Sequence, residues 1–172
     1  MPPETAESVD LHGAIRDEET LRLALRATSC LPFLAGPPVA LDGQRLIDAG
    51  VSAAIPFHAA LADGATHILV LRSRRHGERV QPPGRLSALV TGRALRRMSP
   101  AVENAFLTRA EREHADEDLL DRHRESPELE PHILAIHPFA DSPVPSRLER
   151  DIDLVRAALE AGRAAGHAAL DP

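Results

Sequence analysis

The stretch from Leu41 to Arg72 constrains the fold of this chain more than any other part of the sequence. A short apolar strand is predicted to deliver Asp48 to a turn, Asp48-Ala49-Gly50, and a helix and a second apolar strand follow. A carboxylate at the end of a strand and directly before a helix lies where α/β enzymes place working residues. The stretch therefore predicts an α/β fold and marks Asp48 as the first candidate site residue.

Turn and cap signals set the elements within this stretch. Asp42-Gly43 lies between two short apolar runs and is a strong hairpin signal. The run HILVL is continuously apolar, which is typical of a strand buried on both faces of a parallel sheet. We expect strands at 39–41 and 45–47, a helix at 56–63 that starts at a proline and ends before Gly64, and a strand at 67–71. The strand, helix and strand from 45 to 71 predict a right-handed βαβ unit.

The rest of the chain continues the alternation of helices and strands. Apolar periodicity and Pro- and Gly-containing breaks predict helices at 17–29, 85–98, 100–124 and 147–170, a strand at 132–137, irregular chain at 31–38 and 126–131, and a frayed segment at 1–10. This pattern favours an α/β protein, and 172 residues suit a single domain, 1–172.

Composition and charge exclude several classes of function. The chain has no Trp or Tyr and a net charge of -6, which argue against a nucleic-acid-binding surface. Its single cysteine, Cys30, cannot form an internal disulfide, so a cytoplasmic protein is the default expectation. No apolar run is long enough to span a membrane, and the first ten residues lack the pattern of a signal peptide.

A basic segment follows the second strand of the central stretch. Residues 72–84 contain glycine, proline and four arginines, Arg72, Arg74, Arg75 and Arg79. We expect a solvated loop past the carboxyl end of the strand. The alternative is peripheral membrane contact, with the arginines facing an acidic lipid head group.

Serine hydrolase chemistry needs a nucleophile, a base and donors for the oxyanion. The elbow motif GxSxG is absent, and Gly50-Val51-Ser52-Ala53-Ala54 lacks its second glycine, so Ser52 is expected to be a turn or cap serine. No glycine-rich oxyanion loop is present either. On spacing alone, Asp48 is either a catalytic carboxylate or a residue that caps the following turn.

The histidines do not form a metal motif. None lies in HExxH or in a Cys/His cluster, so we expect no metal site and no cofactor. His58 and His67, near the Asp48 turn and the following strand, are the weaker candidates for a catalytic triad.

The order of features from Arg26 to Arg74 resembles the back half of a patatin-like phospholipase domain. The matching segments are Ala27-Thr28-Ser29-Cys30-Leu31-Pro32, Pro38-Val39-Ala40-Leu41-Asp42-Gly43, Leu46-Ile47-Asp48-Ala49-Gly50-Val51, Ile55-Pro56 and Ala62-Asp63-Gly64-Ala65-Thr66-His67-Ile68-Leu69-Val70. Met98 to Arg112 and Ser146-Arg147-Leu148-Glu149-Arg150-Asp151 also resemble the tail of bacterial members. The resemblance thus implies the C-terminal part of such a domain, within a three-layer α/β/α fold that has a mainly parallel sheet.

The resemblance also implies a function. In that family a Ser-Asp dyad hydrolyses acyl esters of lipids, and the family's aspartate corresponds to Asp48, with Ala49 and Gly50 completing its motif. Ala49 stands where the family has glycine, and a required positive φ there would cost about 1 kcal/mol. We therefore expect a lipid acyl hydrolase whose serine lies on a separate chain or in a missing N-terminal half, and which is inactive alone. The alternatives are a non-catalytic interaction module with an open sheet edge and a truncated gene product.

Overall fold

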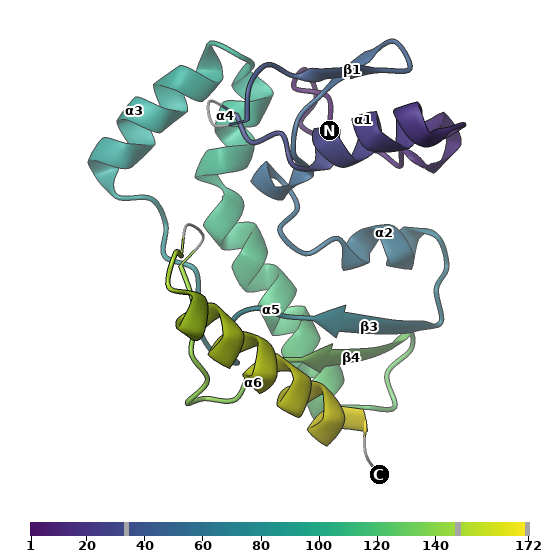
Figure 1. Ribbon diagram of the computed structural model, residues 1–172, viewed down its shortest axis with the longest axis vertical. Coiled ribbons are helices and arrows are strands. Elements are labelled where there is room, and N and C mark those ends of the chain that lie inside the picture. Colours follow the sequence, from purple (N-terminus) through teal and green to yellow (C-terminus); the bar gives the residue numbers. More distant parts are fainter. Residues whose placement is uncertain (33–34, 147–148, 171–172) are drawn as a thin grey trace. The chain divides into compact units, whose positions relative to one another are not determined.

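The computed structural model describes residues 1–32, 35–146 and 149–170, and it contains both helices and strands. The predicted α/β class is confirmed (Figure 1). In chain order the elements are η1 (His12–Ala14), α1 (Glu18–Thr28), β1 (Val39–Leu41), β2 (Gln44–Leu46), η2 (Ala49–Val51), α2 (Phe57–Ala62), β3 (His67–Leu71), α3 (Arg85–Arg96), α4 (Pro100–Leu107), α5 (Arg109–Glu125), β4 (His132–Ile136) and α6 (Ile152–Leu170).

Two compact units divide the chain, and the predicted single domain, 1–172, stays a prediction. The first unit holds residues 1–56 and 80–114, and the second holds residues 57–79 and 115–172. Each unit is therefore assembled from two separate segments of the chain, a feature that local sequence signals do not reveal.

Helix α1 and the β1–β2 hairpin form one side of the first unit and confirm the predicted helix and hairpin. The side chain of Asp17 accepts a hydrogen bond from the Thr20 backbone N–H and caps α1. Asp42 and Gly43 have φ values of 49° and 76°, the positive pair that a two-residue hairpin requires. Between helix and hairpin lies a small apolar core of Ala14, Ala24, Ala27, Cys30, Val39, Leu41 and Leu46.

The first residues of the chain pack against the first unit, where the sequence predicted fraying. The Met1 amino group donates to the Ile47 carbonyl at 2.7 Å, and the Ile47 N–H donates to the Met1 carbonyl at 2.9 Å. Met1 and Pro3 are buried. Residues 7–10 are exposed, so only the very start of the predicted frayed segment is held in place.

Helices α3 and α4 pack together in the first unit and join a second core (Figure 1). This core contains Met1, Ile47, Val51, Leu95, Val102 and Ala105. The helix predicted at 100–124 is interrupted at Thr108, which caps α4 and whose hydroxyl donates to the Asn104 carbonyl at 2.9 Å. The predicted single helix is therefore two helices, α4 and α5.

Strands β3 and β4 form the sheet of the second unit. They pair in parallel, with His67 opposite His132 and Leu71 opposite Ile136. Helix α2 contacts β3, and α6 contacts β4. Helix α6 begins at Ile152, and the first part of the helix predicted from 147, residues 147–148, lies outside the described residues.

Two expectations about the central stretch are wrong. Strand β2 pairs with β1 in an antiparallel hairpin, while β3 pairs with β4, so strand 45–47 and strand 67–71 form no βαβ unit. Strand β3 is also not buried on both faces. Val70 is 5% exposed, whereas Leu69 and Leu71 are 52% and 73% exposed. Among the described residues the parallel sheet has two strands, β3 and β4.

Candidate functional site

Asp48 lies two residues after β2 and is the N-cap of the short helix η2. Its backbone N–H donates to the carbonyl of the buried Cys30 at 3.0 Å, which ties the turn to the chain that follows α1. Ile47, one residue earlier, is 1% exposed and anchors the chain in the core. The turn is therefore fixed on both sides by buried residues, as a positioned carboxylate requires.

The Asp48 carboxylate is half-buried and hydrogen-bonded through one oxygen. Oδ1 accepts a hydrogen bond from the Gly50 N–H at 2.7 Å. Oδ2 accepts none within the part of the chain that the structure describes. A Cβ on residue 50 would lie 3.0 Å from Oδ1, so glycine leaves room for this contact. Asp48 is therefore a turn cap, and one of its oxygens remains free to accept a proton.

Ala49 fits the turn without strain. Among the described residues, the non-glycine residues with positive φ are Ala6 and Asp42. Ala49 lies in the η2 turn and is not one of them. The glycine-to-alanine departure at this position therefore carries no cost from positive φ, and it gives no reason for the carboxylate to shift.

Ser52 is a turn serine, as predicted. Its hydroxyl contacts the Ala49 carbonyl at 3.2 Å and the Met1 sulfur at 3.0 Å, and it makes no hydrogen bond to Asp48 within the described chain. The charge of the Met1 amino group interacts with the Asp48 carboxylate. Burial lowers the pKa of this amino group, and the charge of Asp48 partly offsets that effect. The turn thus presents a carboxylate without a neighbouring serine nucleophile.

The comparison with protein families finds a match that includes the Asp48 turn. Residues 1–61 match the model of the patatin-like phospholipase family. The matching region includes Asp48, Ala49 and Gly50 and ends before β3. The predicted resemblance to patatin-like proteins is thus confirmed over residues 1–61, while its extension to residues 62–172 and the assignment to the C-terminal part of the domain stay predictions. No curated protein and no solved structure matches the chain.

The histidines proposed as weaker candidates lie in a different unit from Asp48. His58 and His67 belong to the second unit, whereas Asp48 belongs to the first. His58 Nε2 lies 2.6 Å from Asp116 Oδ1, and His67 Nδ1 lies 3.1 Å from the Thr66 hydroxyl. No group of three or more metal-binding side chains occurs among the described residues.

The basic segment, residues 72–84, is a loop after β3, as expected, and residues 73 and 76–79 are exposed, while several of its side chains pair with α5. Arg72 pairs with Glu117, and Arg79 Nη2 lies 2.6 Å from Asp118 Oδ1. His76 Nε2 lies 3.0 Å from Asp121 Oδ1, and Arg75 donates to the Ser142 carbonyl. The sequence shows the charges of both segments but not that they pair with each other. The opposite charges within α5 are also typical of an exposed helix whose charges pair along its own surface.

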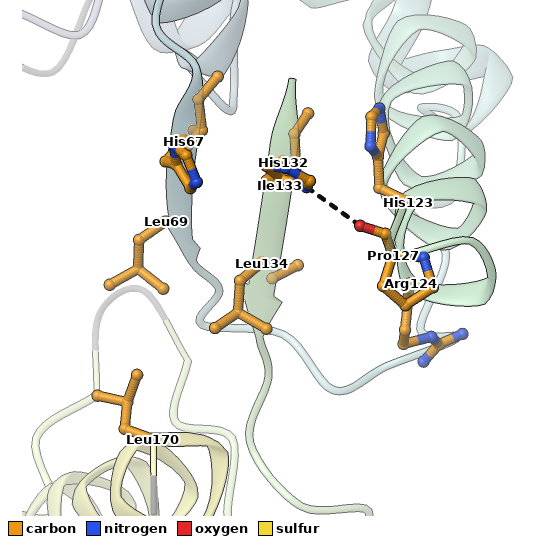
Figure 2. Close-up of a pocket in the computed structure, with 11 residues that line it drawn as sticks. His67, Leu69, His123, Arg124, Pro127, His132, Ile133, Leu134 and Leu170 are labelled. Atoms are coloured by element: carbon orange, nitrogen blue, oxygen red, sulfur yellow. Dashed lines mark hydrogen bonds between the residues drawn. The ribbon is translucent and has the colours of Figure 1, made fainter. Parts of the chain in front are cut away.

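A cavity of about 550 Å³ in the second unit was missed by sequence reasoning (Figure 2). The His67 and His132 rings lie 4.9 Å apart across the strands, and His123 Nδ1 has no hydrogen-bond partner in the described structure. The walls of this cavity are mostly apolar and are formed by His67, Ile68, Leu69, His123, Arg124, Pro127, His132, Ile133, Leu134, Ala135 and Leu170. These residues include no carboxylate, hydroxyl or thiol, so the cavity offers no serine, cysteine or acidic nucleophile for acyl transfer.

No helix among the described residues has both the length and the apolar character needed to cross a membrane. Cytoplasmic residence stays a prediction from the sequence.

Proposed function

We propose that Asp48 is the general base of a Ser-Asp dyad in a patatin-like lipid acyl hydrolase. One observation supports this more than any other. Asp48 stands in the segment that matches the patatin-like phospholipase family, with Oδ1 held by the Gly50 N–H and Oδ2 without a hydrogen bond in the described chain. A carboxylate fixed through one oxygen can take a proton on the other, which is the geometry of a positioned base.

The proposed reaction has two steps. In the first, Oδ2 of Asp48 accepts the proton of a serine hydroxyl while the serine oxygen attacks the ester carbonyl of a lipid. The alcohol then leaves with that proton, and an acyl-serine remains. In the second step a water molecule gives its proton to Asp48 and attacks the acyl group. The fatty acid is released, and the proton returns to the serine oxygen.

The serine and the oxyanion donors of this reaction lie outside these 172 residues, on a separate chain or in a preceding segment. The sequence has no GxSxG motif, and Ser52 is committed to the Ala49 carbonyl and the Met1 sulfur. The DNA upstream of Met1 and the neighbouring genes are where a GxSxG motif preceded by a glycine-rich loop is to be sought.

A reconstitution assay tests the proposal. The purified chain is incubated with a short-chain p-nitrophenyl ester, alone and together with the segment that carries GxSxG. We expect no turnover from the chain alone and turnover from the mixture. Robust turnover by the chain alone, with one of its own serines labelled by a fluorophosphonate probe, would show that the missing-nucleophile proposal is wrong.

A second candidate function is a non-catalytic interaction module on the same scaffold. The observation in its favour is the sheet of the second unit, where β3 and β4 have no further strand on either edge among the described residues and Leu69, Leu71 and Leu134 are exposed. Open edges and exposed leucines favour pairing with another chain. A stable, monodisperse monomer by light scattering would contradict this candidate.

A further inference from the structure

Helix α3 concentrates positive charge in an acidic protein. Residues 85–97 contain four arginines, Arg85, Arg93, Arg96 and Arg97, and no aspartate or glutamate. The whole chain has a net charge of -6. The local charge of the helix is therefore opposite to that of the protein that carries it.

The same helix exposes a cluster of large apolar side chains. Leu86, Leu89 and Val90 are 75%, 68% and 61% exposed. Their spacing of three and four residues places them on one face. The opposite face is occupied within the first unit, because Leu95 is buried and Gly92 approaches Glu103 and Leu107 of α4.

The arginines lie on the exposed side with the apolar cluster and are free to bind anions. Arg85, Arg93 and Arg97 form no ion pair within the described chain. Arg96 Nε lies 3.8 Å from Glu103 Oε2, and its side chain remains 70% exposed. A contact of this length with an exposed arginine is worth little.

A comparison of α3 with helix α6 indicates what kind of partner binds the α3 surface. It also exposes apolar side chains, Ile152, Val155 and Leu159. Its arginines are balanced in number by acids, because Arg156 and Arg163 are matched by Asp153 and Glu160 on the same helix. Exposed apolar side chains alone do not specify a partner, but exposed leucines beside unbalanced arginines match a surface that is negative outside and apolar beneath.

We propose that the α3 surface, formed by Leu86, Leu89, Val90, Arg85, Arg93, Arg96 and Arg97, binds the surface of an anionic lipid bilayer. The leucines and the valine enter the boundary between head groups and acyl chains. The arginine side chains extend their apolar stems and place their guanidinium groups among the lipid phosphates. This binding does not depend on Asp48, so it holds whether or not the proposed hydrolysis is correct.

Vesicle flotation with the full chain tests the proposal, without any ester substrate. The vesicles contain phosphatidylcholine alone or with about 30% phosphatidylserine, because anionic lipid creates the surface potential that attracts arginines. We expect flotation with the anionic vesicles, weak flotation with neutral ones, and release from the anionic vesicles at high salt.

Paired variants separate the two contributions. The double variant Leu86→Gln/Leu89→Gln removes the main apolar contacts and is expected to weaken binding about tenfold or more. The double variant Arg93→Gln/Arg97→Gln is expected to weaken binding roughly tenfold to thirtyfold and to reduce the salt dependence. The matched controls Leu159→Gln and Arg156→Gln lie on α6 and are expected to bind like the wild type.

Circular dichroism of every variant checks that the fold is kept. The proposal is overturned if the wild-type chain does not float with anionic vesicles. It is also overturned if the α3 and α6 variants lose binding equally. It is overturned too if the α3 variants bind vesicles as well as the wild type and are monomeric in light scattering, where the wild-type chain self-associates. The last result would assign the α3 surface to a second copy of the chain.

Discussion

At the scale of single residues, the contact between Asp48 and Gly50 is the feature on which the proposed chemistry depends. The 2.7 Å hydrogen bond from the Gly50 N–H holds Oδ1 and leaves Oδ2 for a proton. The sequence pointed to Asp48 because a short strand, a turn and a small residue coincide there. It did not show that Ala49 is free of strain, since backbone φ values are not encoded in residue spacing alone.

The substitution Gly50→Ala is expected to disturb the carboxylate. The new Cβ would stand 3.0 Å from Asp48 Oδ1, so the carboxylate must move and its hydrogen bond must weaken. We expect a loss of about 1 kcal/mol of folding free energy, measured by urea unfolding followed by circular dichroism. The control is Gly13→Ala, where an added Cβ meets nothing within 4 Å. Equal stability of the two variants would show that Gly50 is not required for the turn.

His137 makes the stability of the second unit depend on pH. Burial lowers the pKa of His137, and the hydrogen bond to the Arg74 carbonyl and the charge of Glu117 oppose that shift, while Arg72 and His76 add to it. The folded state therefore binds this proton less readily than the unfolded state does. The contribution of His137 to stability is present above its unfolded pKa of about 6.5 and is lost as the pH falls through the lowered folded pKa.

Unfolding by urea at a series of pH values tests this. The wild type is expected to lose more stability than His137→Gln as the pH falls below about 6.5. Parallel stability curves for the two proteins in this range would show that His137 does not cause the loss.

At the scale of elements, local signals predicted helices and turns better than they predicted strand pairing. The helix predicted from residue 17 and the Asp42-Gly43 turn were both read correctly, because each depends on neighbours within a few residues. The pairing of β3 with β4 was not predicted, since it brings together His67 and His132, which are 65 positions apart in the sequence. The α5 partners of the basic segment were missed for the same reason.

The substitution Asp17→Ala is expected to loosen the start of α1. Hydrogen bonds from the backbone and side chain of Thr20 lower the pKa of Asp17. The carboxylate form is thus the one that caps the helix, and its contribution is present above its unfolded pKa and lost as the pH falls through the lowered folded value. We expect the variant to lower the Tm by about 2–4 °C at neutral pH, with the difference shrinking in acid. A Tm difference that is the same at acid and neutral pH would contradict the cap assignment.

The ion pair between Arg72 and Glu117 is expected to stabilise the attachment of the basic segment to α5. Their side chains are 9% and 15% exposed, so Arg72→Met leaves the Glu117 carboxylate without its buried partner. We expect a loss of about 3 kcal/mol in urea unfolding. Arg79→Met is the matched control. Its pair with Asp118 is more than half exposed, and its loss is expected to stay below about 1 kcal/mol. Similar losses in both variants would contradict the assignment of a buried pair.

At the scale of the whole molecule, the patatin-like match and the division into units do not coincide. The match covers residues 1–61, whereas the first unit holds residues 1–56 and 80–114. The α/β class could be predicted because alternating helices and strands are visible locally. Sequence reasoning did not predict the two units, the exposure of β3 or the cavity of the second unit. Each of these depends on which segments, distant in sequence, meet in the fold.

The central claim is that Asp48 activates a serine supplied from outside these residues. The most direct measurement is the rate at which a fluorophosphonate probe labels that serine in the mixture of this chain with the GxSxG-bearing segment. With Asp48→Asn we expect labelling to slow about 100-fold or more, because the base is lost. With Asp42→Asn, in the hairpin turn, the rate should stay within about twofold, since Asn also accepts positive φ. Labelling of the Asp48→Asn mixture at the wild-type rate would contradict the account.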